Sequence, residues 1–175
     1  MKKLVESFSR TKTLIFAASI FLLTMILVNS VVKPDFTYLT QTFQYTPTDV
    51  YHLLSRIGEN GRKIHLLVFL ADLLMVGCYS VSLIGLNYKI FNRLSLKCGT
   101  FTFITFSPLL LSLIQLIEIV CLFILIISYP NQLTSLANLA NIVTIGKTVL
   151  TPICFITPLI GLGLPLLRRR HVESE

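Results

Sequence analysis

Three ionisable side chains, Asp72, Glu118 and Lys147, interrupt long apolar stretches of the sequence. A charge that faces lipid costs at least ~2.5–3.5 kcal/mol, so such residues normally face the interior of a helical bundle and pair with one another. At about 1.5 Å of helix per residue, a tilted fourth helix would bring all three to a similar depth in the outer half of the membrane. The sequence therefore predicts an internal Asp72–Lys147–Glu118 cluster.

The charges in this cluster do not balance, because two carboxylates face one ammonium group. A proton on one carboxyl group, a contribution from Arg62 or His65, or a bound cation or cationic ligand would balance them. A structural ion pair needs only one acid. Three roles stay open: a buried network that fixes helix register, a site for a ligand, proton or ion, and a catalytic acid–base pair.

Other polar residues share helix faces with the charged groups. His65, Asp72 and Tyr79 are spaced by seven residues, which places them on one stripe of a helix. Gln115 lies three residues before Glu118, on the same face. In the fourth stretch, polar residues recur every three or four positions, at Asn138, Asn141, Thr144, Lys147 and Thr151. The candidate ligand- or ion-binding residues are therefore Asp72, Glu118, Lys147, Gln115, Asn141, His65, Tyr79 and Arg62.

The sequence contains none of the strong catalytic or cofactor-binding motifs. It has no G-x-S-x-G, no H-E-x-x-H, no P-loop and no dinucleotide fingerprint. The histidines His52, His65 and His171 lie in different settings, and the cysteines form no C-x-x-C pair. We therefore expect no metal and no cofactor, and we favour a non-enzymatic role over an enzymatic one.

The elements that must position the cluster are long apolar helices. Hydrophobic residues make up 54% of the chain and charged residues 13%, and the mean hydropathy is +0.78. Each of four apolar blocks reaches the ~20 residues that a helix needs to cross the bilayer: 13–32, 64–86, 101–128 and 136–167. The sequence predicts an all-α polytopic membrane protein, a bundle of four transmembrane helices that forms a single membrane domain over residues 1–175. We expect the proline-rich fourth helix to be tilted and kinked.

A short amphipathic helix is predicted at about 47–58, between the first two spans. Thr46 is a candidate N-cap, Pro47 suits the first helical position, and Gly58 suits the end. We expect this external helix to lie on the membrane surface or to cap the bundle, and a lid over a ligand is the alternative. Tyr38, Tyr45 and Tyr51 suit the aromatic belt at the membrane interface.

The basic residues are distributed unequally between the two sides of the predicted membrane domain. One side holds Lys2, Lys3, Arg10, Lys12, Lys89, Arg93, Lys97, Arg168, Arg169 and Arg170, and the other holds Lys33, Arg56, Arg62 and Lys63. By the positive-inside rule, both termini are cytoplasmic. These charges suit anionic lipid rather than nucleic acid. The first apolar stretch is longer than a signal-peptide core, so we expect it to be retained as a span.

The order of several motifs resembles an uncharacterised group of small bacterial four-span membrane proteins. The resemblance covers about residues 45–150 and rests on G-x-x-G-R at Gly58–Arg62, Asp72, Glu118, the Tyr129-Pro130 turn, and T-x-x-K at Thr144–Lys147. Such proteins usually carry D-x-x-E-N in the third span, where this chain has Gln115 and Ile119 in place of the Asp and Asn. The resemblance implies a bacterial plasma membrane and no known activity.

A looser likeness in architecture is to the EXPERA group, which includes sterol isomerases and the sigma-2 receptor. Its members have four or more spans and an acid-lined pocket that opens from the membrane. We therefore expect an integral membrane protein whose polar cluster binds a small or lipid-like molecule, cations included. The alternatives are a proton- or cation-coupled transporter or pore, and an intramembrane isomerase or lipid-modifying enzyme with Glu118 and Asp72 as acid and base.

Overall fold

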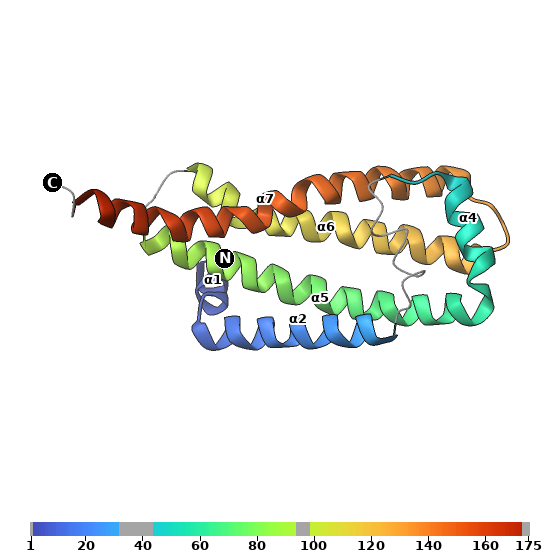
Figure 1. The fold of residues 1–175 in the computed structure, drawn as a ribbon, viewed down its shortest axis with the longest axis horizontal. Helices are drawn as coiled ribbons and strands as arrows, with labels where there is room; N and C mark the ends of the chain where they lie inside the picture. Colours follow the sequence, from blue (N-terminus) through green and yellow to red (C-terminus); the bar gives the residue numbers. More distant parts are fainter. Residues whose placement is uncertain (1, 32–43, 94–98, 173–175) are drawn as a thin grey trace.

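The computed structural model describes residues 2–31, 44–93 and 99–172, and every regular element within these ranges is an α-helix. In chain order, the helices are α1 (Lys2–Phe8), α2 (Thr11–Val31), α4 (Pro47–Arg56), α5 (Gly58–Arg93), α6 (Gly99–Ser128) and α7 (Thr134–Val172) (Figure 1). Lys33, Tyr38 and Lys97 lie outside the described residues.

Four of these helices are long and apolar enough to cross a membrane: Thr11–Ser30, Gly58–Asn92, Ile104–Ser128 and Thr134–Gly161. The predicted all-α, multi-pass fold is therefore confirmed, although some helix ends differ. The second long helix begins at Gly58 rather than near residue 64. Its first turns are polar and carry an ion pair between Glu59 and Lys63 at 2.6 Å, so the apolar block in the sequence covers only part of the helix. The fourth continues through Pro152, Pro158 and Pro165 to Val172.

The long helices run up and down along the length of the molecule, so both chain ends lie at the same end of the bundle (Figure 1). Helices α5, α6 and α7 pack against one another, and α2 packs mainly against α5. Many large apolar side chains on the outer faces are exposed, among them Leu67, Leu113 and Ile142. An exposed aliphatic surface of this extent is suited to contact with lipid.

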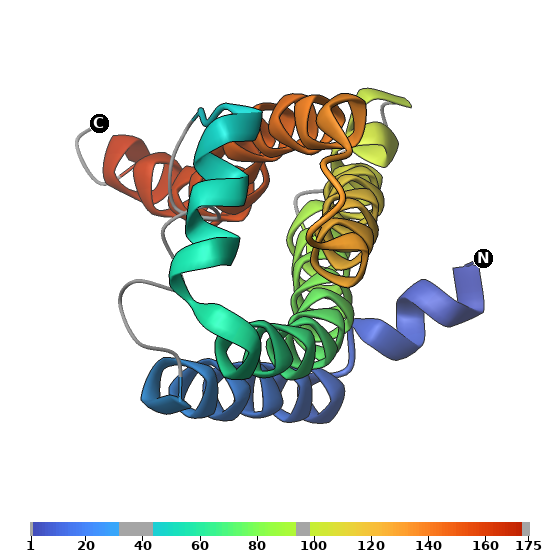
Figure 2. The same ribbon diagram turned by 90° about the vertical axis from the view of Figure 1, so that its right-hand side faces the viewer.

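Helix α4 crosses the other end of the bundle, from α7 to α5 (Figure 2). It begins as predicted: the Thr46 hydroxyl accepts a hydrogen bond from the Asp49 amide at 3.3 Å, and the Asp49 carboxylate accepts one from the Thr46 amide at 2.8 Å. This capping holds the pKa of Asp49 below its usual range. Gly58, at φ +66°, then allows the sharp change of direction into α5.

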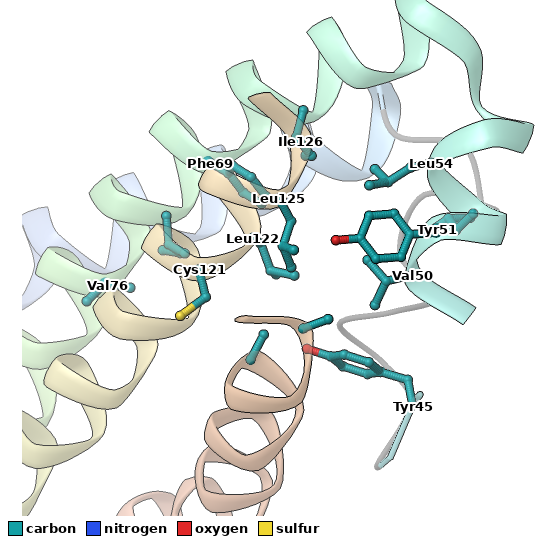
Figure 3. Packing of buried hydrophobic residues seen from close by; sticks show 14 residues of the cluster. Tyr45, Val50, Tyr51, Leu54, Phe69, Val76, Cys121, Leu122, Leu125 and Ile126 are labelled. Atoms are coloured by element: carbon teal, nitrogen blue, oxygen red, sulfur yellow. The ribbon is translucent and has the colours of Figure 1, made fainter. Parts of the chain in front are cut away.

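The apolar face of α4 is buried against the end of the bundle, as expected for a cap. Val50 and Leu54 point towards Leu122 and Leu125 of α6 (Figure 3). Arg62 fastens the far end of α4, because its guanidinium donates to the Leu54 carbonyl at 3.0 Å. The apolar contacts of α4 and the hydrogen bond from Arg62 to Leu54 thus close this end of the bundle.

The short helix α1 was not predicted from the sequence. It lies against α5, where the Phe8 carbonyl approaches the backbone of Gly85 so closely that a Cβ at that position would be 2.3 Å from the Phe8 oxygen. Lys89 of α5 also donates to the Thr11 hydroxyl at 3.0 Å. Because α1 has only seven residues, its helical state depends on these tertiary contacts rather than on local signals.

We predict that Thr46→Ala lowers the free energy of unfolding by about 1 kcal/mol, because it removes the N-cap of α4. Reversible unfolding of the purified protein in mixed micelles measures this loss. Thr48→Ala is the matched control: the same residue type on an exposed position of the same helix, outside the cap. An equal loss in both variants would show that the cap does not stabilise α4.

Candidate functional site

Glu118 is the centre of a polar group in the interior of the bundle. Its side chain comes from α6, is about 1% exposed as a residue, and forms an ion pair with Lys147 of α7. The Thr144 hydroxyl donates to the second carboxylate oxygen at 2.6 Å. Glu118 and Thr144 stand at equal distances along the chain from the turn at 129–133, so antiparallel packing of α6 and α7 brings them face to face. Both oxygens of Glu118 are therefore satisfied by α7.

Tyr45, directly before α4, extends this network towards the capped end. Its hydroxyl lies 3.1 Å from the Thr144 hydroxyl, and its backbone amide donates to the Asn141 side-chain oxygen at 3.1 Å. The Tyr45 ring extends from the segment before α4 towards α7 (Figure 3). Burial raises the pKa of Tyr45 to about 12, so this phenol stays protonated and can donate at neutral pH.

Asp72 lies near this network but is not bonded into it. It projects from α5, is partly exposed, and interacts through space with the charges of Lys147 and Glu118. Across residues 2–31, 44–93 and 99–172, its carboxylate makes no hydrogen bond or ion pair. Lys147 pairs with Glu118 instead. The predicted cluster therefore consists of a bonded Glu118–Lys147 pair with a second carboxylate beside it.

The other predicted site residues are spread along the bundle. Arg62 belongs to the capped end, where its guanidinium lies 4.4 Å from the centre of the Tyr129 ring. His65 is buried under α4, edge-on to Phe69 with ring centres 5.8 Å apart. Gln115 lies one turn from Glu118 and is partly buried. Of these, only Gln115 lies close to the ion pair along its helix.

Tyr79 lies two helical turns from Asp72 on α5, towards the end with the termini. Its hydroxyl is buried and has no hydrogen-bond partner in the described part of the chain, and its ring centre is 6.4 Å from that of Phe155. A layer of buried Leu83, Leu111 and Cys154 packs against Tyr79. These apolar side chains, together with the buried and mutually hydrogen-bonded hydroxyls of Ser80 and Ser112, lie between the polar group and the end of the bundle with the termini.

The sequence did not reveal the bonding roles of Tyr45 and Thr144. The sequence favours the membrane interface for Tyr45 and Tyr51, but both are buried in the structure, with exposed fractions of 4% and 8%. The Tyr51 hydroxyl accepts a hydrogen bond from the Leu133 amide before α7. Thr144 could have been recognised from its position between Asn141 and Lys147 in the series of polar residues that recur every three or four positions of the fourth stretch. Within the described ranges, no group of three or more His, Cys, Asp or Glu side chains is placed to hold a metal ion.

We predict that Lys147→Met destabilises the protein by about 3–5 kcal/mol, because it leaves the buried Glu118 carboxylate without its counter-charge. Asp72→Asn should cost less than about 1 kcal/mol, because it removes a carboxylate that has no bonded partner to lose. Unfolding of both variants under the same conditions measures the difference. A loss in Asp72→Asn as large as that in Lys147→Met would contradict the assigned pairing.

Comparison of the chain with known proteins finds no matching protein-family model, no match among curated proteins and no match among solved structures. The resemblances described from the sequence therefore stay predictions.

Proposed function

We propose that this is a non-enzymatic integral membrane protein that binds a small cationic molecule, amphiphilic cations included, at Asp72. The observation that carries the proposal is that Lys147 is already paired with the buried Glu118, which leaves the Asp72 carboxylate without an ion partner among the described residues. When all three groups are ionised, two carboxylates and one ammonium group leave one negative charge at membrane depth. A cationic ligand supplies the charge that the protein lacks.

The energies favour a ligand that carries the opposite charge. An unpaired carboxylate within a membrane span costs at least ~2.5–3.5 kcal/mol. Two opposite charges about 4 Å apart attract by about 4 kcal/mol at an effective dielectric constant of ~20. A cation next to Asp72 therefore offsets the cost of placing that carboxylate in the bundle.

Exposure supports Asp72 rather than Glu118 as the group that meets the ligand. The Glu118 side chain is 2% exposed, whereas Lys147 keeps 13% and Asp72 is only partly buried. The accessible part of the polar group thus lies on the Asp72–Lys147 side. The rings of Tyr79 and Phe155 lie further along the bundle and suit the apolar part of an amphiphilic cation.

The proposed orientation places the α4 end outside and both termini in the cytoplasm of a bacterium. The support is the distribution of charge in the sequence: Lys2, Lys3 and Arg10 precede α2, Lys12 lies in its first turn, and three arginines lie near the end of α7. With this orientation, Asp72 lies nearer the outer end of α5 than the inner end. The ligand would enter from the outer half of the bilayer.

We predict that alkylammonium and quaternary ammonium compounds raise the melting temperature of the purified protein in nanodiscs, while uncharged compounds of the same shape do not. A ligand at a hundred times its Kd stabilises the folded state by about 2.7 kcal/mol. Asp72→Asn should abolish the shift. Glu59→Gln is the matched control, because Glu59 is an exposed acid on the same helix. A shift that persists in Asp72→Asn, or no shift with any cation, would overturn the proposal.

A second candidate function is a proton- or cation-coupled transporter. The observation in its favour is the hydrogen-bonded series from Tyr45 through Thr144 and Glu118 to Lys147, which leads from the capped end to the polar group. Transport would require the packed layer of Leu83 and Leu111 to open. A gradient-driven flux in liposomes that is lost in Asp72→Asn would favour the transporter over the simple binder.

A further inference from the structure

A second concave site lies at the capped end of the molecule, apart from Asp72. A cavity of about 490 Å³ lies between one face of α4 and the connection between α6 and α7. Its polar lining comes from both sides: Thr48, His52 and Ser55 of α4, and Tyr129, Gln132 and Thr134 of the turn and the start of α7. A cavity of this size is within the range of small-molecule sites in proteins.

The two walls of this cavity are fastened to each other. The Tyr51 hydroxyl of α4 accepts a hydrogen bond from the Leu133 amide, directly before α7. Arg62 contacts both walls, since it donates to the Leu54 carbonyl at the end of α4 and lies 4.4 Å from the centre of the Tyr129 ring. The cavity is therefore formed before any ligand binds, which lowers the entropy cost of binding.

The chemistry of the lining selects among classes of ligand. Hydroxyl, amide and imidazole groups line the cavity together with tyrosine and proline rings, and none of the lining residues is Asp, Glu, Lys or Arg. The charged group that contacts both walls, the Arg62 guanidinium, is already bound to the Leu54 carbonyl and lies over the Tyr129 ring. A hydrocarbon would bury the hydroxyl and amide groups without partners, at a cost of about 1–3 kcal/mol each.

We propose that this cavity binds a neutral saccharide. Sugar hydroxyls can exchange hydrogen bonds with Ser55, Gln132 and Thr134, while the C–H face of a sugar ring packs on the Tyr129 ring. The lining supplies both kinds of contact in one place. A free saccharide and the saccharide headgroup of a glycolipid share this chemistry, and the lining by α4 and the connection from α6 to α7, at one end of the bundle, suits either source.

Saturation-transfer NMR on the protein in nanodiscs without glycolipid tests the proposal with methyl glucoside, methyl N-acetylglucosaminide and maltose as probes. Maltoside and glucoside detergents must be removed first, because they carry the proposed ligand group. We expect saturation transfer to at least one neutral sugar, and weaker transfer to glucosamine and glucuronate. A second set of nanodiscs, with glucosyl diacylglycerol as a lipid component, tests the headgroup source by its competition with the free sugar.

Ser55→Phe fills the cavity and should abolish the saturation transfer. Gln132→Ala keeps an exposed turn position but removes the amide, and should raise the Kd about tenfold. Asn60→Ala is the control, because Asn60 is an exposed amide outside the cavity. Melting temperatures check that each variant is folded, and Gln132→Ala keeps the test decisive if Ser55→Phe does not fold.

Several outcomes would overturn the saccharide site: no transfer and no competition with any neutral sugar, a preference for a charged sugar, or transfer that is unchanged in Ser55→Phe and Gln132→Ala. Saturation transfer to a free sugar in glycolipid-free nanodiscs supports the free source. A fall in that transfer when glucosyl diacylglycerol is present supports the headgroup as a ligand of the same cavity. The saccharide site does not depend on the cation proposal, so Asp72→Asn should retain sugar binding.

Discussion

One ammonium group can neutralise one carboxylate, and in the part of the bundle that the structure describes Asp72 and Glu118 lie near a single lysine, Lys147. Lys147 pairs with Glu118, the more deeply buried acid, and Thr144 satisfies the second oxygen of that acid. This arrangement joins α6 to α7 at a fixed register, because sliding either helix by a turn would leave Glu118 unpaired in an apolar setting. It also leaves Asp72 of α5 as the carboxylate without a bonded partner among the described residues.

The same network connects the bundle to its cap. Tyr45 bonds to Thr144 and Asn141, Tyr51 bonds to the chain before α7, and Arg62 bonds to the end of α4. Polar contacts thus hold helix α4 at its start, middle and end, in addition to the apolar contacts of its buried face. One proposed binding site lies at this cap, between α4 and the connection from α6 to α7, and the other lies at Asp72 in the bundle.

Much of the fold could be predicted because its signals are local. Apolar length identifies the four spans, and Thr46, Pro47 and Gly58 mark the ends of α4 within a few residues. The meeting of Glu118 and Lys147 also follows from a simple rule, since charges avoid lipid. The choice between Glu118 and Asp72 as the partner of Lys147 depends on how α5, α6 and α7 rotate against one another, which the sequence does not state. The roles of Tyr45 and α1 likewise depend on tertiary contacts.

A pair of double-mutant cycles tests the central assignment most directly. One cycle combines Glu118→Gln with Lys147→Met, and the other combines Asp72→Asn with Lys147→Met, each read from the free energy of unfolding. The structure predicts a coupling energy of about 2–3 kcal/mol between Glu118 and Lys147, and under about 1 kcal/mol between Asp72 and Lys147. A larger coupling between Asp72 and Lys147 than between Glu118 and Lys147 would contradict the account, because Glu118 would then be the unpaired acid.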